Sequence, residues 1–221
     1  MTIFDSIAAV IDGLKRSSHV EVLFNKNKLT PDDQLIYQQT VLEAIIDLKV
    51  PLSIAESLKI DGDLHVYWKS KVHQEDKGVF GEFFLQSVIV FGASNQLNEV
   101  FLSRRYKTIA DMREMRVFDY YAYNGGPIYS LLRVIDDRLD EHVYVFNERD
   151  VFTTTLDYAE YLKRVRLTRG FQFWQYLFCE SPDIKDYELA AIKRGLDFLE
   201  SEFPNDDYSD LKGKLVALEN D

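Results

Sequence analysis

Hydrophobic residues at the start of the chain recur at the spacing of a single helix face. Within residues 1–17 they occur at Ile3, Phe4, Ile7, Val10, Ile11 and Leu14. Positions three and four apart lie on the same side of an α-helix, so this spacing predicts an amphipathic helix. The next stretch, HVEVLF at residues 19–24, is ambiguous, because it fits either a short strand or the entry to a second helix.

Residues 30–60 carry the start signals and the periodicity of two more helices. Thr30 suits the N-cap and Pro31 the first helical position of a helix over 30–50. The segment PLSIAESLKI, residues 51–60, predicts a further short helix.

The middle of the chain changes to short runs that are rich in aromatic and β-branched residues. Such runs favour strands, because these side chains pack well on a pleated, half-buried surface. The runs occur at residues 63–72, 78–90, 116–123, 127–135 and 142–148. Asn124, Gly125 and Gly126 predict a tight turn between the third and fourth runs, since both residue types tolerate positive φ. The loop 136–141 connects the last two runs.

Helical spacing returns in the C-terminal third of the chain. We expect a helix over 156–179, capped by the threonines at 153–155 and bent near Gly170. Ser181 and Pro182 provide an N-cap and a first helical position for the next helix. A short last helix is expected over 208–218.

The sequence RLTRGFQFWQYLFCE, residues 166–180, gathers aromatic side chains around the only cysteine. Its aromatic residues are Phe171, Phe173, Trp174, Tyr176 and Phe178. A binding platform, a reactive thiol site and a piece of buried core are the three interpretations. Aromatic residues on nearly every side of the predicted helix favour the core, because a solvated platform would keep one polar face. Cys179 then fills space in that core.

The order of helices, strands and helices predicts an α+β fold, not alternating βαβ units. We expect an antiparallel-dominated, curved sheet of about five or six strands, flanked by N-terminal and C-terminal helices. No repeat or flexible linker divides the chain, so a single domain over 1–221 is expected. Its parts are a helical region 1–56, the sheet with its closing helix 57–180, and an acidic helical extension 181–221.

Composition narrows the class of partner. The 221 residues are 46% hydrophobic, which is enough for a large core, and carry a net charge of −11. This charge disfavours binding to nucleic acid or to an anionic membrane surface.

A single cysteine forms no internal disulfide, the first residues lack the pattern of a signal peptide, and no apolar run is long enough to span a membrane. We therefore expect a cytoplasmic protein.

The sequence lacks the patterns that carry catalysis or cofactor binding. The four histidines never fall at the spacing of zinc ligands. The chain also lacks the glycine-rich motifs that hold phosphates and the motif of a serine nucleophile. We predict no catalytic residue, no cofactor and no metal ion.

Carboxylates provide the clustered polar residues of the chain. The loop between the last two strand runs holds Asp136, Asp137, Asp140 and Glu141. A solvated hairpin turn, an acidic patch that faces a partner, and a metal site are the alternatives for this loop, although it lacks the alternating ligand spacing of calcium loops. Residues 181–221 are acidic too, with eleven Asp or Glu against five Lys or Arg. They form either the exposed side of terminal helices or a surface for a basic protein.

The block from about Ser57 to Glu180 resembles the SUKH superfamily. The residues that carry the resemblance are SLKIDGDLHVYWKS, GEFFLQSVI, the pair RVFDYYAY and YSLLRVI, HVYVFNE, and TTTLDYAEYLKRVRLTRGFQFWQYLF. The resemblance implies an α+β fold with a curved sheet and no enzymatic activity. Bacterial members are commonly immunity proteins that bind and neutralise toxins, often nucleases, whereas the eukaryotic branch is regulatory. The first 50 residues and the acidic tail past Ser181 depart from the family pattern.

These observations together predict a non-enzymatic protein-binding module. The leading hypothesis is an immunity protein that neutralises a bacterial polymorphic or contact-dependent toxin. It would bind a basic toxin domain through Asp136, Asp137, Asp140 and Glu141, and be a monomer or weak dimer by itself. The alternative is an intracellular regulatory or scaffold protein without a toxin partner. Neither hypothesis involves a nucleic acid or a membrane.

Overall fold

The computed structural model describes residues 3–29, 49, 51, 54, 60–71, 78–87, 112, 114–121, 128–147 and 150–220. In chain order the elements are α1 (Ile3–Arg16), β1 (Val20–Leu29), β2 (Ile60–Ser70), β3 (Phe80–Gln86), β4 (Met115–Tyr120), β5 (Tyr129–Ile135), β6 (Arg138–Phe146), β7 (Val151–Asp157), α6 (Tyr158–Thr168), the 3₁₀ helix η3 (Trp174–Phe178), α7 (Asp186–Glu202) and α8 (Ser209–Asn220). The helices predicted over 30–50 and 51–60 lie almost wholly outside the described residues, and so does the turn predicted at 124–126.

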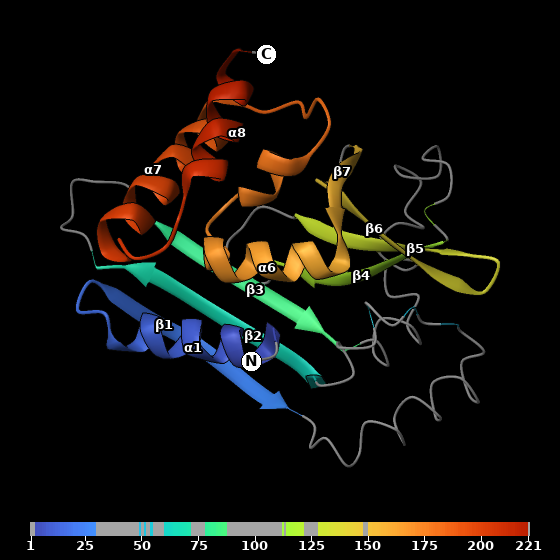
Figure 1. Cartoon of the computed structure of the whole chain (residues 1–221), viewed down its shortest axis with the longest axis horizontal. Coiled ribbons are helices and arrows are strands. Elements are labelled where there is room, and N and C mark those ends of the chain that lie inside the picture. The colour runs from blue at the N-terminus through green and yellow to red at the C-terminus, as the bar shows by residue number, and fades with distance from the viewer. Residues whose placement is uncertain are drawn as a thin grey trace.

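The expected α+β fold is confirmed, but the strands form two sheets instead of one (Figure 1). The first sheet has the order β1-β2-β3 and the second the order β4-β5-β6-β7, with antiparallel neighbours throughout. At the boundary, the Asp119 side chain of β4 accepts a hydrogen bond from the backbone N–H of Phe84 on β3, at 2.7 Å. A carboxylate, and not a backbone carbonyl, thus accepts from β3 at this point, and the strands expected in a single sheet lie in two.

Seven strands appear among the described residues, where about five or six were expected. One of the additional strands is β1, which settles the ambiguity of residues 19–24 in favour of a strand. It pairs antiparallel with β2 from Val20 opposite Ser70 to Leu29 opposite Ile60. The other is β7, in a segment assigned to a helix and its cap.

The inner faces of the strands follow the two-residue period of a β-strand. Leu64, Val66 and Trp68 on β2 and Phe83 and Leu85 on β3 are almost completely buried. They pack in one core cluster with residues of the helices and of the second sheet.

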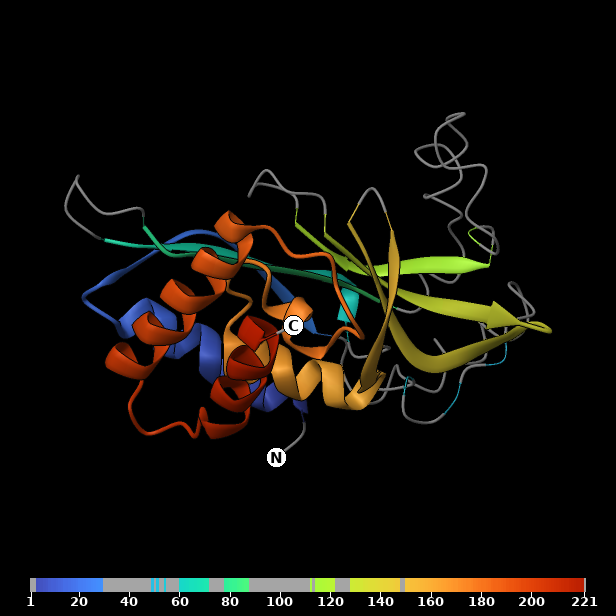
Figure 2. The same ribbon diagram turned by 90° about the horizontal axis from the view of Figure 1, so that it is seen from above.

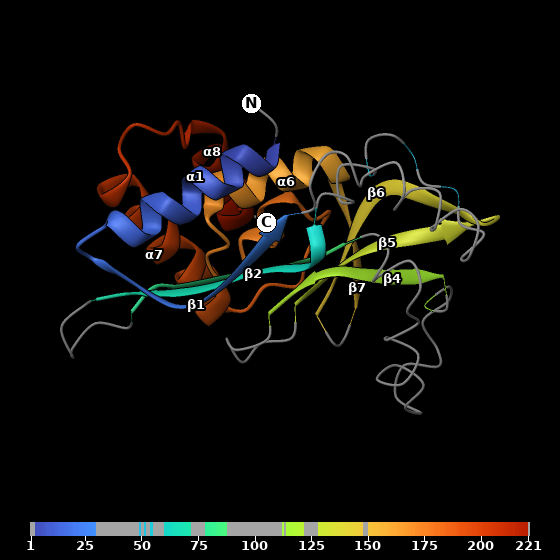
Figure 3. The ribbon, with the colours of Figure 1, turned by 90° about the horizontal axis from the view of Figure 1, so that it is seen from below.

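Helices cover one side of the three-stranded sheet. Figure 2 shows α1 and α6 next to each other on the same side of β1–β3, and Figure 3 shows this arrangement from below. Ile7, Val10, Ile11 and Leu14 of α1 are buried against the core, which confirms the amphipathic helix predicted at the start of the chain. α7 and α8 pack against each other at the end of the chain.

The helix expected from residue 156 begins later, because Val151–Asp157 form strand β7. This strand pairs antiparallel with β6 and buries Phe152, Thr154 and Leu156, every second residue. The N-cap of α6 is Asp157, whose Oδ1 accepts from the backbone N–H of Glu160 at 2.7 Å. The threonines at 153–155 therefore belong to a strand, where β-branched side chains pack well.

The same helix also ends earlier than expected, at Thr168. Arg169 has a φ of 51° and Gly170 a φ of 67°. These left-handed values do not continue a right-handed helix, and the indole Nε1 of Trp68 donates to the carbonyl of Arg169 at 2.8 Å to fix the exit. Gly170 marks the end of the helix and not a bend within it.

α7 starts at Asp186 with Lys185 as N-cap, so the prediction of Ser181 as N-cap is wrong. Ser181 has a φ of 45°, and the chain becomes helical only five residues later. The Glu188 carboxylate then accepts from the backbone N–H of Lys185 at 2.8 Å, a reciprocal bond typical of helix starts. The last predicted helix, over 208–218, is confirmed as α8.

Candidate functional site

The acidic loop predicted at 136–141 is a two-residue turn followed by a strand. Asp136 and Asp137 have φ values of 48° and 58°, and Ile135 pairs with Arg138 directly across the turn. Aspartate adopts left-handed φ more readily than most residues, and two such residues in succession match the twist of a hairpin. Strand β6 therefore begins at Arg138, which places the four predicted carboxylates on one hairpin.

The four carboxylates differ in their surroundings. Asp136 and Asp137 are exposed at the tip, whereas Asp140 and Glu141 are half-buried along β6. Asp140 accepts a hydrogen bond from the backbone N–H of His142 at 3.2 Å.

A groove of about 540 Å³ runs beside this hairpin. It is lined by Lys49, Pro51, Ile135, Asp136, Arg138, Leu139, Asp140 and Glu141. The structure thus brings three of the four predicted residues into one concave surface, with Asp137 next to it at the tip. We call this surface the hairpin groove.

A residue far away in the sequence completes the hairpin groove. The backbone N–H of Lys49 donates to the carbonyl of Asp137 at 2.8 Å, and the N–H of Leu139 donates to the carbonyl of Lys49 at 3.0 Å. Lys49 therefore pairs in parallel with Arg138, on the side of β6 that faces away from β5. This contact was missed from the sequence, because nothing in residues 30–60 indicates which strand edge they meet.

The lining combines charge with an apolar patch. Three carboxylates face two cations, Lys49 and Arg138, and Ile135 is 43% exposed at the margin. Within the part of the chain that the structure describes, none of the four carboxylates of the hairpin forms an ion pair. They are available to a cationic side chain from outside.

Many carboxylates of the C-terminal extension are in a different situation. Asp206 pairs with Arg169 at 2.8 Å and Asp210 with Arg164 at 2.9 Å. Glu200 pairs with Lys212 and Glu219 with Lys193. Internal pairing neutralises part of this surface, so the hairpin is the better candidate for contact with a basic partner.

Glu202 also binds within the chain. It accepts from the Ser17 hydroxyl at 2.6 Å and lies 2.7 Å from Nδ1 of His19. Burial alone would raise the pKa of Glu202, but these two hydrogen bonds and the charge of His19 lower it overall. The contact ties the end of α7 to the connection between α1 and β1.

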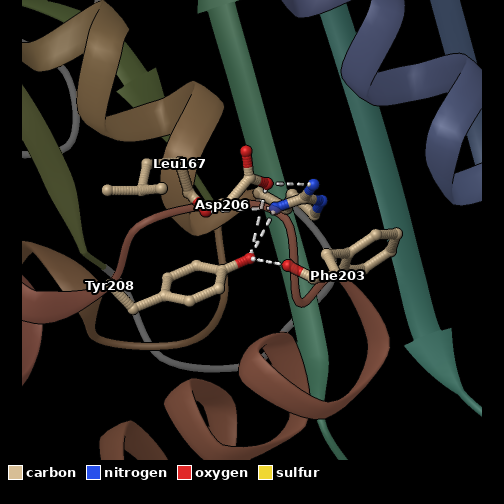
Figure 4. Close-up of polar contacts among 5 residues, drawn as sticks. Leu167, Phe203, Asp206 and Tyr208 are labelled. Atoms are coloured by element: carbon tan, nitrogen blue, oxygen red, sulfur yellow. Dashed lines mark hydrogen bonds and ion pairs between the residues drawn. The ribbon is translucent and has the colours of Figure 1, made fainter.

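Arg169 is the centre of a buried polar cluster at the end of α6. It donates to the Tyr208 hydroxyl at 3.2 Å, pairs with Asp206, and lies over the ring of Phe203, with Cζ 3.7 Å from the centroid. Figure 4 shows Tyr208, Asp206 and Phe203 around the guanidinium group that they contact. The Tyr208 hydroxyl also donates to the Phe203 carbonyl at 3.3 Å. Because Arg169 is only 6% exposed, the cluster fixes the α7–α8 connection to α6 and presents little surface to a partner.

The aromatic segment joins the two sheets. Phe171 pairs with Gly81 on β3, and Cys179 pairs with Thr154 on β7. We call residues 169–180 the bridging segment, because one end lies against the first sheet and the other against the second.

The five aromatic residues of the bridging segment are buried, with at most 7% of any of them exposed. The interpretation of this segment as core is therefore confirmed. Burial also raises the pKa of the Cys179 thiol well above its ordinary value. A thiol in this state is a poor nucleophile, because the reactive form is the thiolate.

A buried network of titratable side chains lies where the two sheets meet. His65 and Glu82 are 2.8 Å apart, and Asp119 accepts from the hydroxyl of Tyr161 at 2.6 Å. Glu82 and Asp119 have no exposed surface and His65 has 4%. These groups cannot touch a substrate in this conformation, so the network is not a candidate active site. Sequence reasoning missed it, although each of the three polar residues lies inside a predicted strand.

Two further observations concern the class of protein. Among the described helices, none has both the length and the apolar character needed to cross a membrane. Comparison of the chain with protein-family models, curated proteins and solved structures gave no match. The resemblance to the SUKH superfamily therefore stays a prediction.

Proposed function

We propose that the chain is a non-enzymatic protein-binding module whose hairpin groove holds a basic segment of a partner protein. The partner is a toxin domain that the chain neutralises in the cytoplasm. The observation that carries the proposal is the contrast in charge pairing. The hairpin carboxylates form no ion pair with described residues, whereas several acidic residues of the C-terminal helices are paired internally.

The lining of the groove fits a long cationic side chain. The methylene part of a lysine or arginine packs against the exposed side chain of Ile135, while its charge reaches Asp136, Asp140 or Glu141. Lys49 and Arg138 add positive charge to the groove. A cationic side chain of the partner is therefore attracted to some positions in the groove and repelled from others. Complementary charge of this kind raises the association rate and selects the partner more than it raises affinity.

The toxin part of the proposal is supported by the resemblance to the SUKH superfamily and by the net charge of −11. Many bacterial toxin domains of the nuclease class are basic because they bind nucleic acid, which is anionic. A strongly acidic protein is attracted to such a surface before any specific contact forms.

The hairpin is tested by removing its charge without changing its shape. In the test variant Asp136→Asn, Asp137→Asn, Asp140→Asn and Glu141→Gln are combined. Asparagine tolerates the left-handed φ of the turn, so the hairpin should keep its geometry. The control variant combines Asp12→Asn, Glu180→Gln, Asp183→Asn and Asp197→Asn, four exposed residues without an ion pair in the described part of the chain. Both variants change the net charge by the same amount.

Proteins captured from the native host by the wild-type chain are compared with those captured by each variant. A captured protein is then purified, and its dissociation constant is measured by calorimetry. We expect the test variant to bind at least about fourfold more weakly, since four exposed or half-buried charges of about 0.2–1 kcal/mol each contribute about 0.8–4 kcal/mol in total. The control variant should bind like wild type. Equal losses in both variants, or no loss in either, would reject the hairpin as the binding surface.

Neutralisation is tested separately in growing cells. The captured protein is expressed alone and together with each form of the chain. We expect the captured protein to inhibit growth when it is expressed alone. The wild-type chain and the control variant should relieve this inhibition, whereas the test variant should not. A captured protein that binds through the hairpin and does not inhibit growth would support a regulatory or scaffold role and contradict the toxin part of the proposal.

A further inference from the structure

One buried carboxylate forms hydrogen bonds where the two sheets meet. Asp119 Oδ1 accepts from the backbone N–H of Phe84 on β3 at 2.7 Å, and Oδ2 accepts from the Tyr161 hydroxyl on α6 at 2.6 Å. We call this contact of Asp119 with Phe84 and Tyr161 the joint. It connects β3, β4 and α6 at the point where the first sheet meets the second.

The hydrogen bonds of the joint can form with or without a proton on Asp119. The hydroxyl oxygens of Ser130 and Tyr161 lie 2.7 Å apart, and either can donate. When Asp119 is ionised, Tyr161 donates to it and Ser130 donates to Tyr161. When Asp119 is protonated, its O–H donates to Tyr161, and Tyr161 donates to Ser130. Both oxygen–oxygen contacts are kept in the two states.

The charge itself is poorly accommodated in this place. Asp119 is completely buried, and the titratable groups that face it are Tyr161 from α6, Glu82 from β3, His65 from β2 and Tyr121 at the end of β4. Glu82 is also buried, and its pairing with His65 at 2.8 Å leaves a second carboxyl group near the first. The hydrogen bonds of the joint therefore stabilise an anion that burial disfavours.

We propose that Asp119 makes the joint proton-responsive: it takes up a proton as the pH falls from 8 to 5, the Tyr161–Ser130 pair reverses its donation, and the two sheets are held together more firmly. This inference does not depend on the proposed function.

The size of the effect follows from linkage. Burial, opposed by the hydrogen bonds from Tyr161 and Phe84, raises the pKa of Asp119 from 3.8 to about 6. A raised pKa means that the closed joint binds the proton more tightly than the open joint. Stability from this group is fully present below pH 3.8 and is lost as the pH rises through about 6. Between pH 8 and pH 5 the equilibrium for opening should change by about tenfold, with the joint opening less at pH 5.

The test measures the joint directly by NMR. The carboxyl carbon of Asp119 is titrated in the wild-type chain, and the protection factor of the Phe84 amide is measured at pH 8 and pH 5. We expect a titration midpoint near pH 6 and about tenfold greater protection at pH 5. In Asp119→Asn the amide oxygen still accepts from Phe84, while the protection should become nearly independent of pH. Asp197→Asn, an exposed change on α7, should behave like wild type.

Two results would overturn the proposal. One is a wild-type titration of Asp119 near pH 4, which needs no variant and remains decisive if Asp119→Asn does not fold. The other is a tenfold change in Phe84 protection that persists in Asp119→Asn, since another group would then be responsible.

Discussion

Replacing Gly170 with alanine should separate the bridging segment from the first sheet. A Cβ at this position would lie 2.4 Å from the carbonyl oxygen and 2.8 Å from the carbonyl carbon of Glu82. Both are backbone atoms inside β3 and cannot rotate away. The φ of 67° adds a second penalty, because a residue with a Cβ rarely adopts it.

The magnitude follows from these two effects. A left-handed backbone costs a non-glycine residue about 1–2 kcal/mol. To relieve the clash the segment must move away from β3, which breaks the 2.7 Å hydrogen bond from the Glu82 N–H to the Gly170 carbonyl. A buried donor left without its acceptor costs about 1–3 kcal/mol. We therefore expect Gly170→Ala to lower the free energy of unfolding by about 2–5 kcal/mol.

Urea unfolding followed by tryptophan fluorescence measures this loss, because Trp68 and Trp174 are both buried. Gly213→Ala is the matched control: it lies within α8, and a Cβ there meets nothing within 4 Å. The control should gain about 0.5–1 kcal/mol, as alanine is the better helix residue. If Gly170→Ala unfolds within about 0.5 kcal/mol of wild type, the close packing of the bridging segment on β3 is wrong.

Three further predictions concern buried or paired groups. Cys179 should react with Ellman's reagent very slowly in the native protein and rapidly in urea, because burial raises its pKa; fast native labelling would contradict this. Arg169→Met should lower the free energy of unfolding in urea by about 1–3 kcal/mol, because the hydrogen bonds of Arg169 to Tyr208 and Asp206 are lost while the partly exposed Asp206 carboxylate stays solvated. A neutral result would show that the cluster is not stabilising. The pKa of Glu202 is lowered in the folded state, so the ionised carboxylate stabilises the fold above pH 4.5, and this stabilisation is lost as the pH falls through the folded pKa. On acidification, the thermal midpoint of wild type should therefore approach that of Glu202→Gln. A constant difference between the two across this range would argue against the contact with Ser17 and His19.

Local pattern was sufficient for the elements whose burial repeats regularly. The first helix follows from its apolar spacing, and the five predicted strand runs all coincide with strands. The burial of the aromatic residues in the bridging segment was also predictable, because they leave no polar face. In these regions the side chains that determine the structure are neighbours in the sequence.

The errors arise where a distant residue decides the structure. Residues 153–155 belong to a strand because Thr153 pairs with Tyr144 on β6 and because Glu180 donates to the Thr153 carbonyl at 2.9 Å. The end of α6 depends on Trp68, about one hundred residues earlier in the chain. At the boundary between the two sheets, the Asp119 carboxylate accepts from the backbone N–H of Phe84 on β3, 35 residues earlier in the chain. None of these contacts leaves a periodic signal.

The candidate site was predicted in part. The carboxylates were expected in a hairpin connection, and they do lie on one hairpin, but the turn is shorter and two of them are on β6. Lys49 could not be assigned to the groove from the sequence. The buried network could have been suspected, since His65, Glu82 and Asp119 interrupt apolar runs that were predicted to be strands.

The binding surface is tested most directly by hydrogen–deuterium exchange of the wild-type chain, free and in complex with the captured partner. The hairpin groove predicts that backbone amides of residues 135–142 become protected in the complex, while those of α7 and α8 are unchanged. Protection confined to α7 and α8, with residues 135–142 exchanging as in the free chain, would contradict the proposed function at its central point.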